Sequence, residues 1–149
     1  MKKVLIPTDG SENSLRAAEY TVKLLRLNPE IEVTVFNVVN VPRRFVARKL
    51  FWVAAERGKA AASIEELFEE ERAEILNRTM AVLEKEGFTA ATAYRKGNPA
   101  EEICEYARDG QFDLIVMGTR GASGIQEILI GSVSHKVLQM APCPVILVK

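Results

Sequence analysis

GTRGASGIQEILIGS, which spans residues 118–132, joins an apolar run at residues 114–117 to a helical pattern at residues 133–140. Its glycines follow the spacing Gly-x2-Gly-x9-Gly-Ser, which ends in Gly131 and Ser132. Glycine permits a positive φ and a close approach of the backbone to a ligand. The Gly131-Ser132 pair opens a helix, whose first N–H groups lack partners within the helix and favour an anion. The stretch predicts a cradle for a polyphosphate, although the same glycines could serve only to make tight turns.

Apolar runs alternate with helical patterns along the rest of the chain. Short apolar or β-branched runs predict strands at residues 2–8, 31–39, 89–95, 112–117 and 145–149. Apolar residues at helical spacing predict helices at about residues 11–28, 64–86, 98–110 and 132–140. Ser11 and Asn98 are expected N-caps, and Pro99 suits the first helical position. This alternation predicts an α/β fold with a parallel sheet and helices on both faces.

Composition and charge bound the class of protein. The chain has 149 residues, of which 48% are hydrophobic and 27% charged, as in globular proteins with a real core. Its net charge of zero argues against general affinity for nucleic acid. We expect no signal peptide and no membrane span, because no apolar stretch approaches 20 residues. Cys104 and Cys143 lack metal-ligand spacing, so free thiols in a cytoplasmic protein are expected.

Three features together resemble the ATP-binding type of the universal stress protein family. They are the glycine signature of residues 118–132, the run KVLIPTDGS at residues 3–11, and the run APCPV at residues 141–145 before the last strand. The resemblance covers nearly the whole chain except about residues 42–62, and it implies one nucleotide-binding domain at residues 1–149 in which 42–62 is an inserted segment. It implies an open, Rossmann-like parallel sheet of five strands in the order 3-2-1-4-5. Ligands bind where the strand order of such a sheet reverses, here between the first and fourth strands.

The resemblance also implies where an adenine nucleotide would bind. Asp9 would accept hydrogen bonds from the ribose, although an aspartate in this place can instead cap the helix that follows. Arg120 would pair with phosphate oxygens, or else remain a solvated loop residue. Asn37 stands where many members carry histidine, which is a departure near the adenine. The expected binding residues are Pro7, Thr8, Asp9, Val38, Met117, Gly118, Arg120, Gly121, Gly131, Ser132 and Val133.

The sequence contains no arrangement of residues that is typical of a catalytic site. His135, the only histidine, is expected to face solvent one helical turn beyond the anion site. The Walker motif GxxxxGK[ST] is absent, and with it the phosphate-binding lysine. No cluster of carboxylates is reserved for a metal, so Mg²⁺ or Mn²⁺ would reach the site through the phosphates of ATP. We therefore predict no catalytic residue and no protein-held metal.

The resemblance implies a cytosolic stress or regulatory protein that binds ATP, or AMP, and works as a nucleotide-dependent switch with slow hydrolysis at most. A nucleotide-using enzyme, either a hydrolase or an adenylyl transferase, is the first alternative. An interaction module that does not bind ATP is the second. The last strand, residues 145–149, would lie at a sheet edge, and the resemblance implies a homodimer formed through it.

Residues 42–62 combine six basic side chains with large apolar ones, including Phe45, Phe51 and Trp52. This composition is unlike that of a flexible, solvent-exposed loop, and it allows a helix that lies on a membrane surface. The same residues could cover the nucleotide site or contact another subunit. We expect a helix within residues 43–57 that packs on protein.

Overall fold

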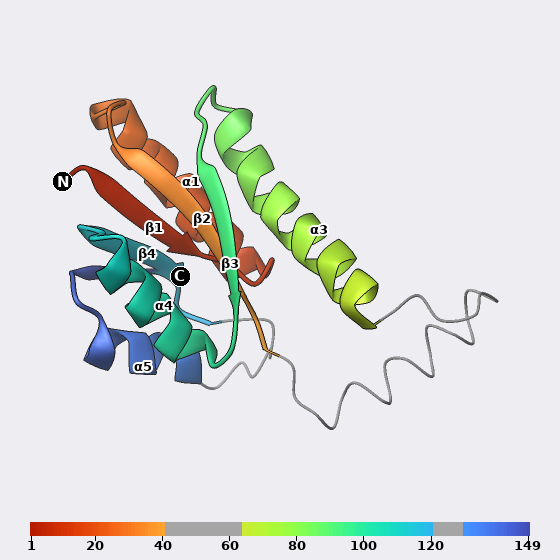
Figure 1. The fold of residues 1–149 in the computed structure, drawn as a ribbon. Coiled ribbons are helices and arrows are strands. Elements are labelled where there is room, and N and C mark those ends of the chain that lie inside the picture. The colour runs from red at the N-terminus through yellow and green to blue at the C-terminus, as the bar shows by residue number, and fades with distance from the viewer. Residues whose placement is uncertain (41–63, 121–129) are drawn as a thin grey trace.

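The computed structural model describes residues 1–40, 64–120 and 130–149, whose strands form one twisted sheet (Figure 1). The strands are β1 (Lys3–Pro7), β2 (Glu32–Val39), β3 (Ala91–Lys96), β4 (Leu114–Gly118) and β5 (Val145–Val148). They lie in the order β3-β2-β1-β4-β5, and every neighbouring pair is parallel. The order expected from the family resemblance is therefore confirmed.

Helices cover both faces of the sheet. In the described parts of the chain they are α1 (Glu12–Leu27), α3 (Ile64–Glu84), α4 (Pro99–Asp109) and α5 (Ser132–Met140). Helices α1 and α3 lie side by side on one face, and α4 and α5 on the other (Figure 1). The expected caps are present, since Ser11 accepts a hydrogen bond from the Ser14 N–H and Asn98 accepts one from the Glu101 N–H.

The central strands are buried on both sides because two hydrophobic cores flank the sheet. On β1, Val4 and Ile6 belong to the core under α1 and α3, whereas Leu5 between them belongs to the core under α4 and α5. All three side chains are fully buried. Successive side chains of a strand point to opposite faces, so a continuous apolar run is what a doubly covered parallel strand requires.

The helical spacing of four residues predicts the apolar face of α1, and they are Leu15, Ala18, Val22 and Leu25. Ala18, Val22 and Leu25 are buried as predicted, whereas Leu15 is only partly buried. The buried face also includes Ser14, Ala17 and Thr21, because α1 packs against both the sheet and α3.

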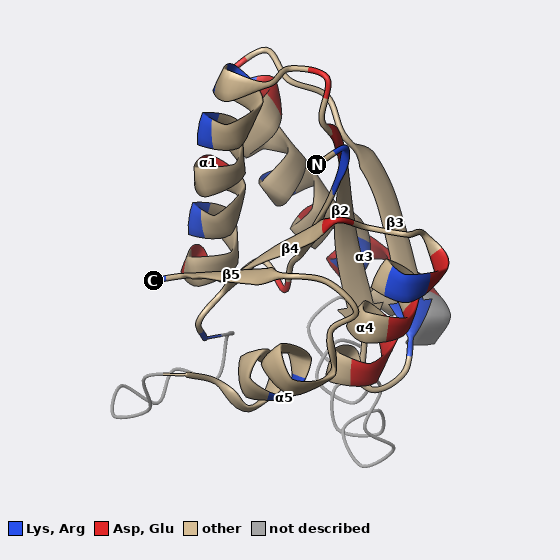
Figure 2. Cartoon of the chain, turned by 90° about the vertical axis from the view of Figure 1, so that its left-hand side faces the viewer, with Lys and Arg blue, Asp and Glu red and all other residues tan. Residues whose placement is uncertain are grey.

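The inserted segment and the expected absence of a membrane span can also be compared with the structure. The inserted segment at residues 42–62, with its expected helix, lies outside the described residues. Figure 2 shows acidic and basic residues interspersed along α1 and α4, whereas β4 and β5 contain none. Within the described ranges, every helix is too short or too polar to cross a bilayer.

Candidate functional site

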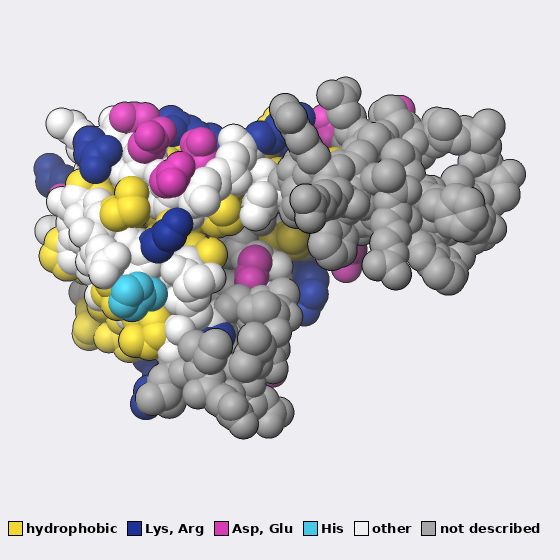
Figure 3. Space-filling view, turned by 90° about the horizontal axis from the view of Figure 1, so that it is seen from below, with side chains coloured by type: hydrophobic (Ala, Val, Ile, Leu, Met, Phe, Trp, Pro, Cys, Tyr) yellow, Lys and Arg dark blue, Asp and Glu magenta, His cyan; other side chains and the backbone are white. Residues whose placement is uncertain are grey.

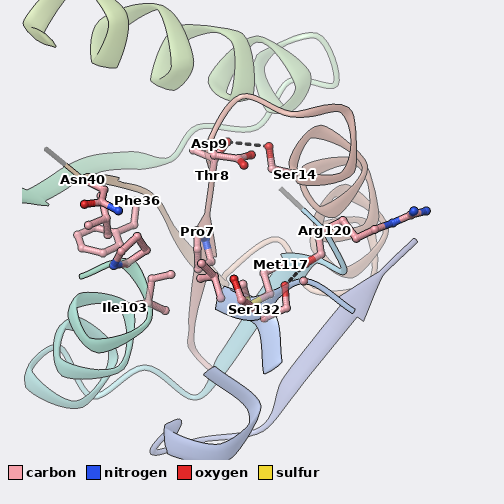
Figure 4. Close-up of a pocket in the computed structure, with 16 residues that line it drawn as sticks. Pro7, Thr8, Asp9, Ser14, Phe36, Asn40, Ile103, Met117, Arg120 and Ser132 are labelled. Carbon is pink, nitrogen blue, oxygen red and sulfur yellow. Dashed lines mark hydrogen bonds between the residues drawn. The ribbon is translucent and has the colours of Figure 1, made fainter. Parts of the chain in front are cut away.

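A cavity of about 310 Å³ lies at the carboxyl ends of β1 and β4, where the strand order reverses (Figure 4). Ten of the eleven residues expected from the sequence line it, namely Pro7, Thr8, Asp9, Val38, Met117, Gly118, Arg120, Gly131, Ser132 and Val133. The eleventh, Gly121, lies outside the described residues. The volume is near the lower end of the range of about 300–1,000 Å³ that is usual for small-molecule sites. The topology thus brings together residues from both ends of the chain.

The cavity has an apolar side and a polar side. Phe36, Val38, Pro99 and Ile103 come from β2 and the start of α4, and they offer surfaces suited to a flat ring. Figure 4 shows Phe36 and Ile103 together on this side, while Thr8 and Asp9 lie across the cavity. A molecule with a planar apolar part and a charged or hydroxylated part would match both sides.

Asp9 stands at the polar rim in the turn between β1 and α1. Its side chain is exposed, and its Oδ1 accepts a hydrogen bond from the Ser11 N–H at 3.0 Å. The helix cap itself is Ser11, whose Oγ accepts from the Ser14 N–H at 3.3 Å. The alternative in which Asp9 caps α1 is therefore wrong. The Ser11 bond orients the carboxylate beside the cavity, where it can accept hydrogen bonds from hydroxyl groups.

Asn37 does not line the cavity, although the sequence placed it close to the expected adenine contact. It is buried, and its Nδ2 donates a hydrogen bond to the Thr8 carbonyl oxygen at 2.8 Å. The Thr8 N–H in turn donates to the Phe36 carbonyl oxygen at 2.8 Å. The amide of Asn37 therefore extends the pairing of β1 with β2 one residue past the strand, and it fixes the backbone that leads to Asp9.

The start of α5 forms the floor opposite this turn. Gly131 is the N-cap residue, and it has φ −69° and ψ 160° with no side-chain cap. Ser132, Val133 and Ser134 follow it and line the cavity. The first N–H groups of a helix have no intrahelical acceptor and carry partial positive charge, so this end suits an anion. The Ser134 Oγ donates to the Gly118 carbonyl oxygen at 3.0 Å, which ties α5 to the end of β4.

The structure describes two glycines of the signature, Gly118 and Gly131, and the reasons for glycine at these two positions differ. At Gly118 a Cβ would lie 2.8 Å from the carbonyl carbon of Asn13 and 2.9 Å from its oxygen, so a side chain does not fit. This glycine is explained by the close approach of β4 to α1. Gly131 does not require a φ reserved for glycine, because its φ of −69° is open to any residue. If glycine is needed at position 131, the reason lies in the cavity that Gly131 lines.

Arg120 lies at the mouth of the cavity and also borders a wider polar hollow between α1 and α3. Figure 4 shows its side chain extending outward, with the terminal nitrogens away from Met117 and Ser132. Asp9 borders both hollows as well. Among the described residues that line the first cavity, Asp9 and Arg120 are the ionisable ones.

His135 is exposed on α5, as expected, and it does not line the cavity. Figure 3 shows this histidine in cyan on the surface. In the part of the chain that the structure covers, no group of three or more histidine, cysteine, aspartate or glutamate side chains is arranged to hold a metal ion.

Sequence reasoning missed six described residues of the cavity, and they are Ser14, Phe36, Asn40, Pro99, Ile103 and Ser134. The rule that sites form beyond the carboxyl ends of strands could have indicated Asn40, which follows β2, and Pro99, which follows β3. The helical spacing of Ile103 and Ala107 indicates that both face inward, but this pattern could not show that Ile103 reaches the cavity. That depends on how α4 is turned against the sheet.

Comparisons with known proteins agree with this architecture. The model of the universal stress protein family matches residues 1–149. Universal stress protein MJ0531 of Methanocaldococcus jannaschii is 38% identical, over 99% of this chain and 82% of that protein. The structure of MJ0577 from the same organism is 30% identical with a TM-score of 0.76, over 99% of this chain and 95% of that one.

A universal stress protein from Archaeoglobus fulgidus, solved in complex with dAMP, is 22% identical. It has a TM-score of 0.64 and covers 100% of this chain and 98% of that one, so the likeness is one of fold. The family match over the full length and the 38% identity to MJ0531 are independent of that fold likeness. Together with the sheet order, they assign the chain to the universal stress protein family.

Proposed function

We propose that this protein binds ATP, or a related adenine nucleotide such as AMP, in the cavity between β1 and β4. The observation that carries the proposal is the meeting of ten residues, anticipated from four separate parts of the sequence, around one cavity. That cavity lies at the switch point of the sheet, where nucleotides bind in folds of this kind. The dAMP complex of the A. fulgidus protein adds that a member of this family holds an adenine nucleotide.

The chemistry of the lining supports one orientation of the nucleotide. The adenine would lie on the apolar side, between Phe36 and Ile103, where a flat ring loses little by leaving water. The ribose hydroxyls would donate to Asp9, whose carboxylate is a charge-assisted acceptor. The phosphates would lie at the start of α5, against Gly131 and Ser132, where the helix N–H groups point at an anion.

We further propose a binding and regulatory role in a stress response, with the nucleotide acting as a switch. The described lining offers no histidine and no pair of acidic groups to activate water, so hydrolysis would be slow at most. Mg²⁺ or Mn²⁺ would arrive with the phosphates. The two cysteines are free thiols, which fits a reducing compartment such as the cytoplasm. An enzyme, the second candidate, would show turnover when ATP consumption is followed over hours.

Isothermal titration with ATP and AMP tests the assignment. Gly131→Val should abolish measurable binding, because a branched side chain would stand between the helix N–H groups and the phosphates. Asp9→Ala should weaken binding by about 1–3 kcal/mol, the usual contribution of hydrogen bonds to a charged group. His135→Ala serves as the matched control from the same helix, and it should bind like the wild type.

Each variant needs a thermal melt first, since Asp9 also accepts the Ser11 N–H. The expected order of affinities is wild type and His135→Ala together, then Asp9→Ala, then Gly131→Val. If the folded wild type gives no heat with ATP or AMP, and also purifies without nucleotide, the cavity is not an adenine-nucleotide site and the interaction-module alternative gains.

A further inference from the structure

We propose that Thr79, on α3, is a positioning residue for the nucleotide site and acts on it through Thr8. This inference rests on the proposed function. Thr79 has no exposed surface and does not line the cavity, so it touches no ligand there. Its hydroxyl oxygen nevertheless lies 2.8 Å from that of Thr8, 71 residues away in the sequence. The contact joins the outer layer of the fold to the wall of the site.

Thr8 and Thr79 belong to a buried chain of hydroxyl groups. The Thr8 Oγ1 donates to the Ser14 Oγ at 3.1 Å, and the Ser14 Oγ donates to the Ser11 carbonyl oxygen at 2.8 Å. The Gly10 N–H donates to the Thr8 Oγ1 at 3.2 Å. Thr8 and Ser14 both line the cavity. These hydrogen-bonded hydroxyl groups therefore connect α3, through the wall of the site, to the first turn of α1.

Three hydroxyl protons, those of Thr8, Ser14 and Thr79, serve four hydrogen-bond contacts in this cluster. The Thr79 Oγ1 donates to the Ile75 carbonyl oxygen at 3.0 Å. Either hydroxyl can supply the proton between Thr8 and Thr79. In both cases Thr79 is a hydrogen-bond partner of the Thr8 hydroxyl, which without it would keep only Ser14 and the Gly10 N–H.

Helix α3 presses on the same turn through a second contact. Gly10 has a φ of +75°, and a Cβ built there would lie 3.1 Å from the Ile75 Cγ1. The turn that carries Asp9 is therefore held between the start of α1 and one turn of α3, formed by Ile75 and Thr79. A change in the position of α3 against the sheet would therefore move Thr8 and the neighbouring Asp9 relative to the start of α5.

Thr21 on α1 provides a matched control. Like Thr79 it is fully buried in a helix, and its hydroxyl donates to the carbonyl oxygen four residues earlier, Ala17, at 2.9 Å. It does not line the cavity. Replacing either threonine by valine keeps the shape and removes a hydroxyl with the same local bond. Only Thr79→Val also removes the hydrogen bond with Thr8.

The experiment compares Thr79→Val, Thr79→Ser and Thr21→Val by titration with ATP and AMP. Thr79→Val should weaken the binding of both nucleotides about five-fold, an effect on the order of one neutral hydrogen bond. The reason is that Thr8 and the turn that carries Asp9 would be held less firmly in the position that the nucleotide needs. Thr79→Ser retains the hydroxyl and should stay within about two-fold of the wild type, as should Thr21→Val. In a Thr8→Val background, which lacks the hydroxyl partner of Thr79, adding Thr79→Val should cause no further loss of affinity.

Several outcomes would overturn the inference. Thr79→Val with wild-type affinity would do so, and so would an equal loss for Thr79→Ser or for Thr21→Val. If Thr79→Val does not fold, the wild type itself decides: ATP should shift the methyl resonance of Thr79 and leave that of Thr21 in place, and an unmoved Thr79 signal at saturation refutes the coupling. A wild type that binds no adenine nucleotide overturns the proposed function as well, whereas nucleotide binding with an unaffected Thr79→Val overturns this inference alone.

Discussion

Gly118 shows how one residue of a binding signature can be required by packing alone. Its backbone does not adopt a left-handed conformation, which Gly10, Gly87 and Gly97 do. What excludes a side chain is the backbone of Asn13, 2.8 Å from a Cβ at this position. The end of β4 and the start of α1 approach so closely that only glycine fits between them. The close approach also brings the two strand ends to one cavity.

Gly118→Ala should therefore destabilise the fold by about 1–3 kcal/mol, the usual cost of forcing extra volume into a packed site. Gly131→Ser is the contrasting variant, because serine suits an N-cap with extended backbone angles and should leave stability unchanged or slightly higher. Urea unfolding of both variants provides the measurement. Equal stability of Gly118→Ala and the wild type would show that β4 and α1 can separate at little cost.

At the scale of elements, an exposed carboxylate joins the start of β1 to the start of β4. Asp113 precedes β4, and its Oδ2 accepts hydrogen bonds from the Lys2 N–H at 2.6 Å and the Lys3 N–H at 2.9 Å. Its own N–H donates to the Lys3 carbonyl oxygen at 2.9 Å. The bonds from the Lys2 and Lys3 N–H groups stabilise the charged form and hold the pKa of Asp113 below its ordinary value.

This lowered pKa gives a pH dependence with a definite sign. Because the folded-state pKa of Asp113 is below the unfolded one, its contribution to stability is full above the unfolded pKa, and it is lost as the pH falls through the folded one. Asp113→Ala should melt below the wild type at pH 7, and the gap should close in acid. Glu19→Ala, which removes an exposed carboxylate from α1, is the control. A gap for Asp113→Ala that stays constant into acid would contradict the proposed role.

Elements and their caps were predictable because their signals are local. Ser11 and Asn98 cap helices in the structure as the sequence indicated, and the apolar runs became strands. The sequence also indicated the buried faces of α1 and α4, since Ala18, Leu25 and Ala107 are buried, but it did not give the full extent of these faces. Leu15 is only partly buried and Thr21 fully buried, because the fit of α1 against α3 and the sheet decides the matter. Likewise Ile103 reaches the cavity through the placement of α4, which no pattern within that helix encodes.

At the scale of the whole molecule, the side formed by α5 and β5 carries few charges and exposes several apolar side chains. Strand β5 is the last in the sheet order, and its four residues are all partly buried rather than buried. Leu138 and Met140 of α5 are each 44% exposed. Figure 2 shows β5 without charged residues, and Lys136 is the one lysine, arginine, aspartate or glutamate in α5. Figure 3 shows apolar side chains beside the histidine of α5. An apolar sheet edge of this kind invites pairing with a second chain.

The hydrogen bonds of β5 show which backbone groups such pairing would use. The carbonyl oxygens of Pro144 and Val148 accept from the Ile115 and Thr119 N–H groups of the β4 side. Bonds alternate along a strand, so Leu147, between the inward-bonded positions, directs its N–H outward. Proline is tolerated at an edge position whose N–H faces away from the sheet. Leu147 is thus a position where an edge-to-edge bond can be removed while the bonds to β4 remain.

We accordingly propose a homodimer formed through residues 145–149, with the two copies of β5 antiparallel across a two-fold axis. The wild type should sediment as a dimer at tens of micromolar, about the concentration at which weak dimers persist. Leu147→Pro should sediment as a folded monomer, because it lacks the outward N–H and carries a ring at the contact. Leu147→Ala, which trims the side chain and keeps the N–H, separates the two effects and should dimerise more weakly than the wild type but more strongly than Leu147→Pro. A monomeric wild type at this concentration, or a Leu147→Pro variant that dimerises fully, would show that β5 is not the contact.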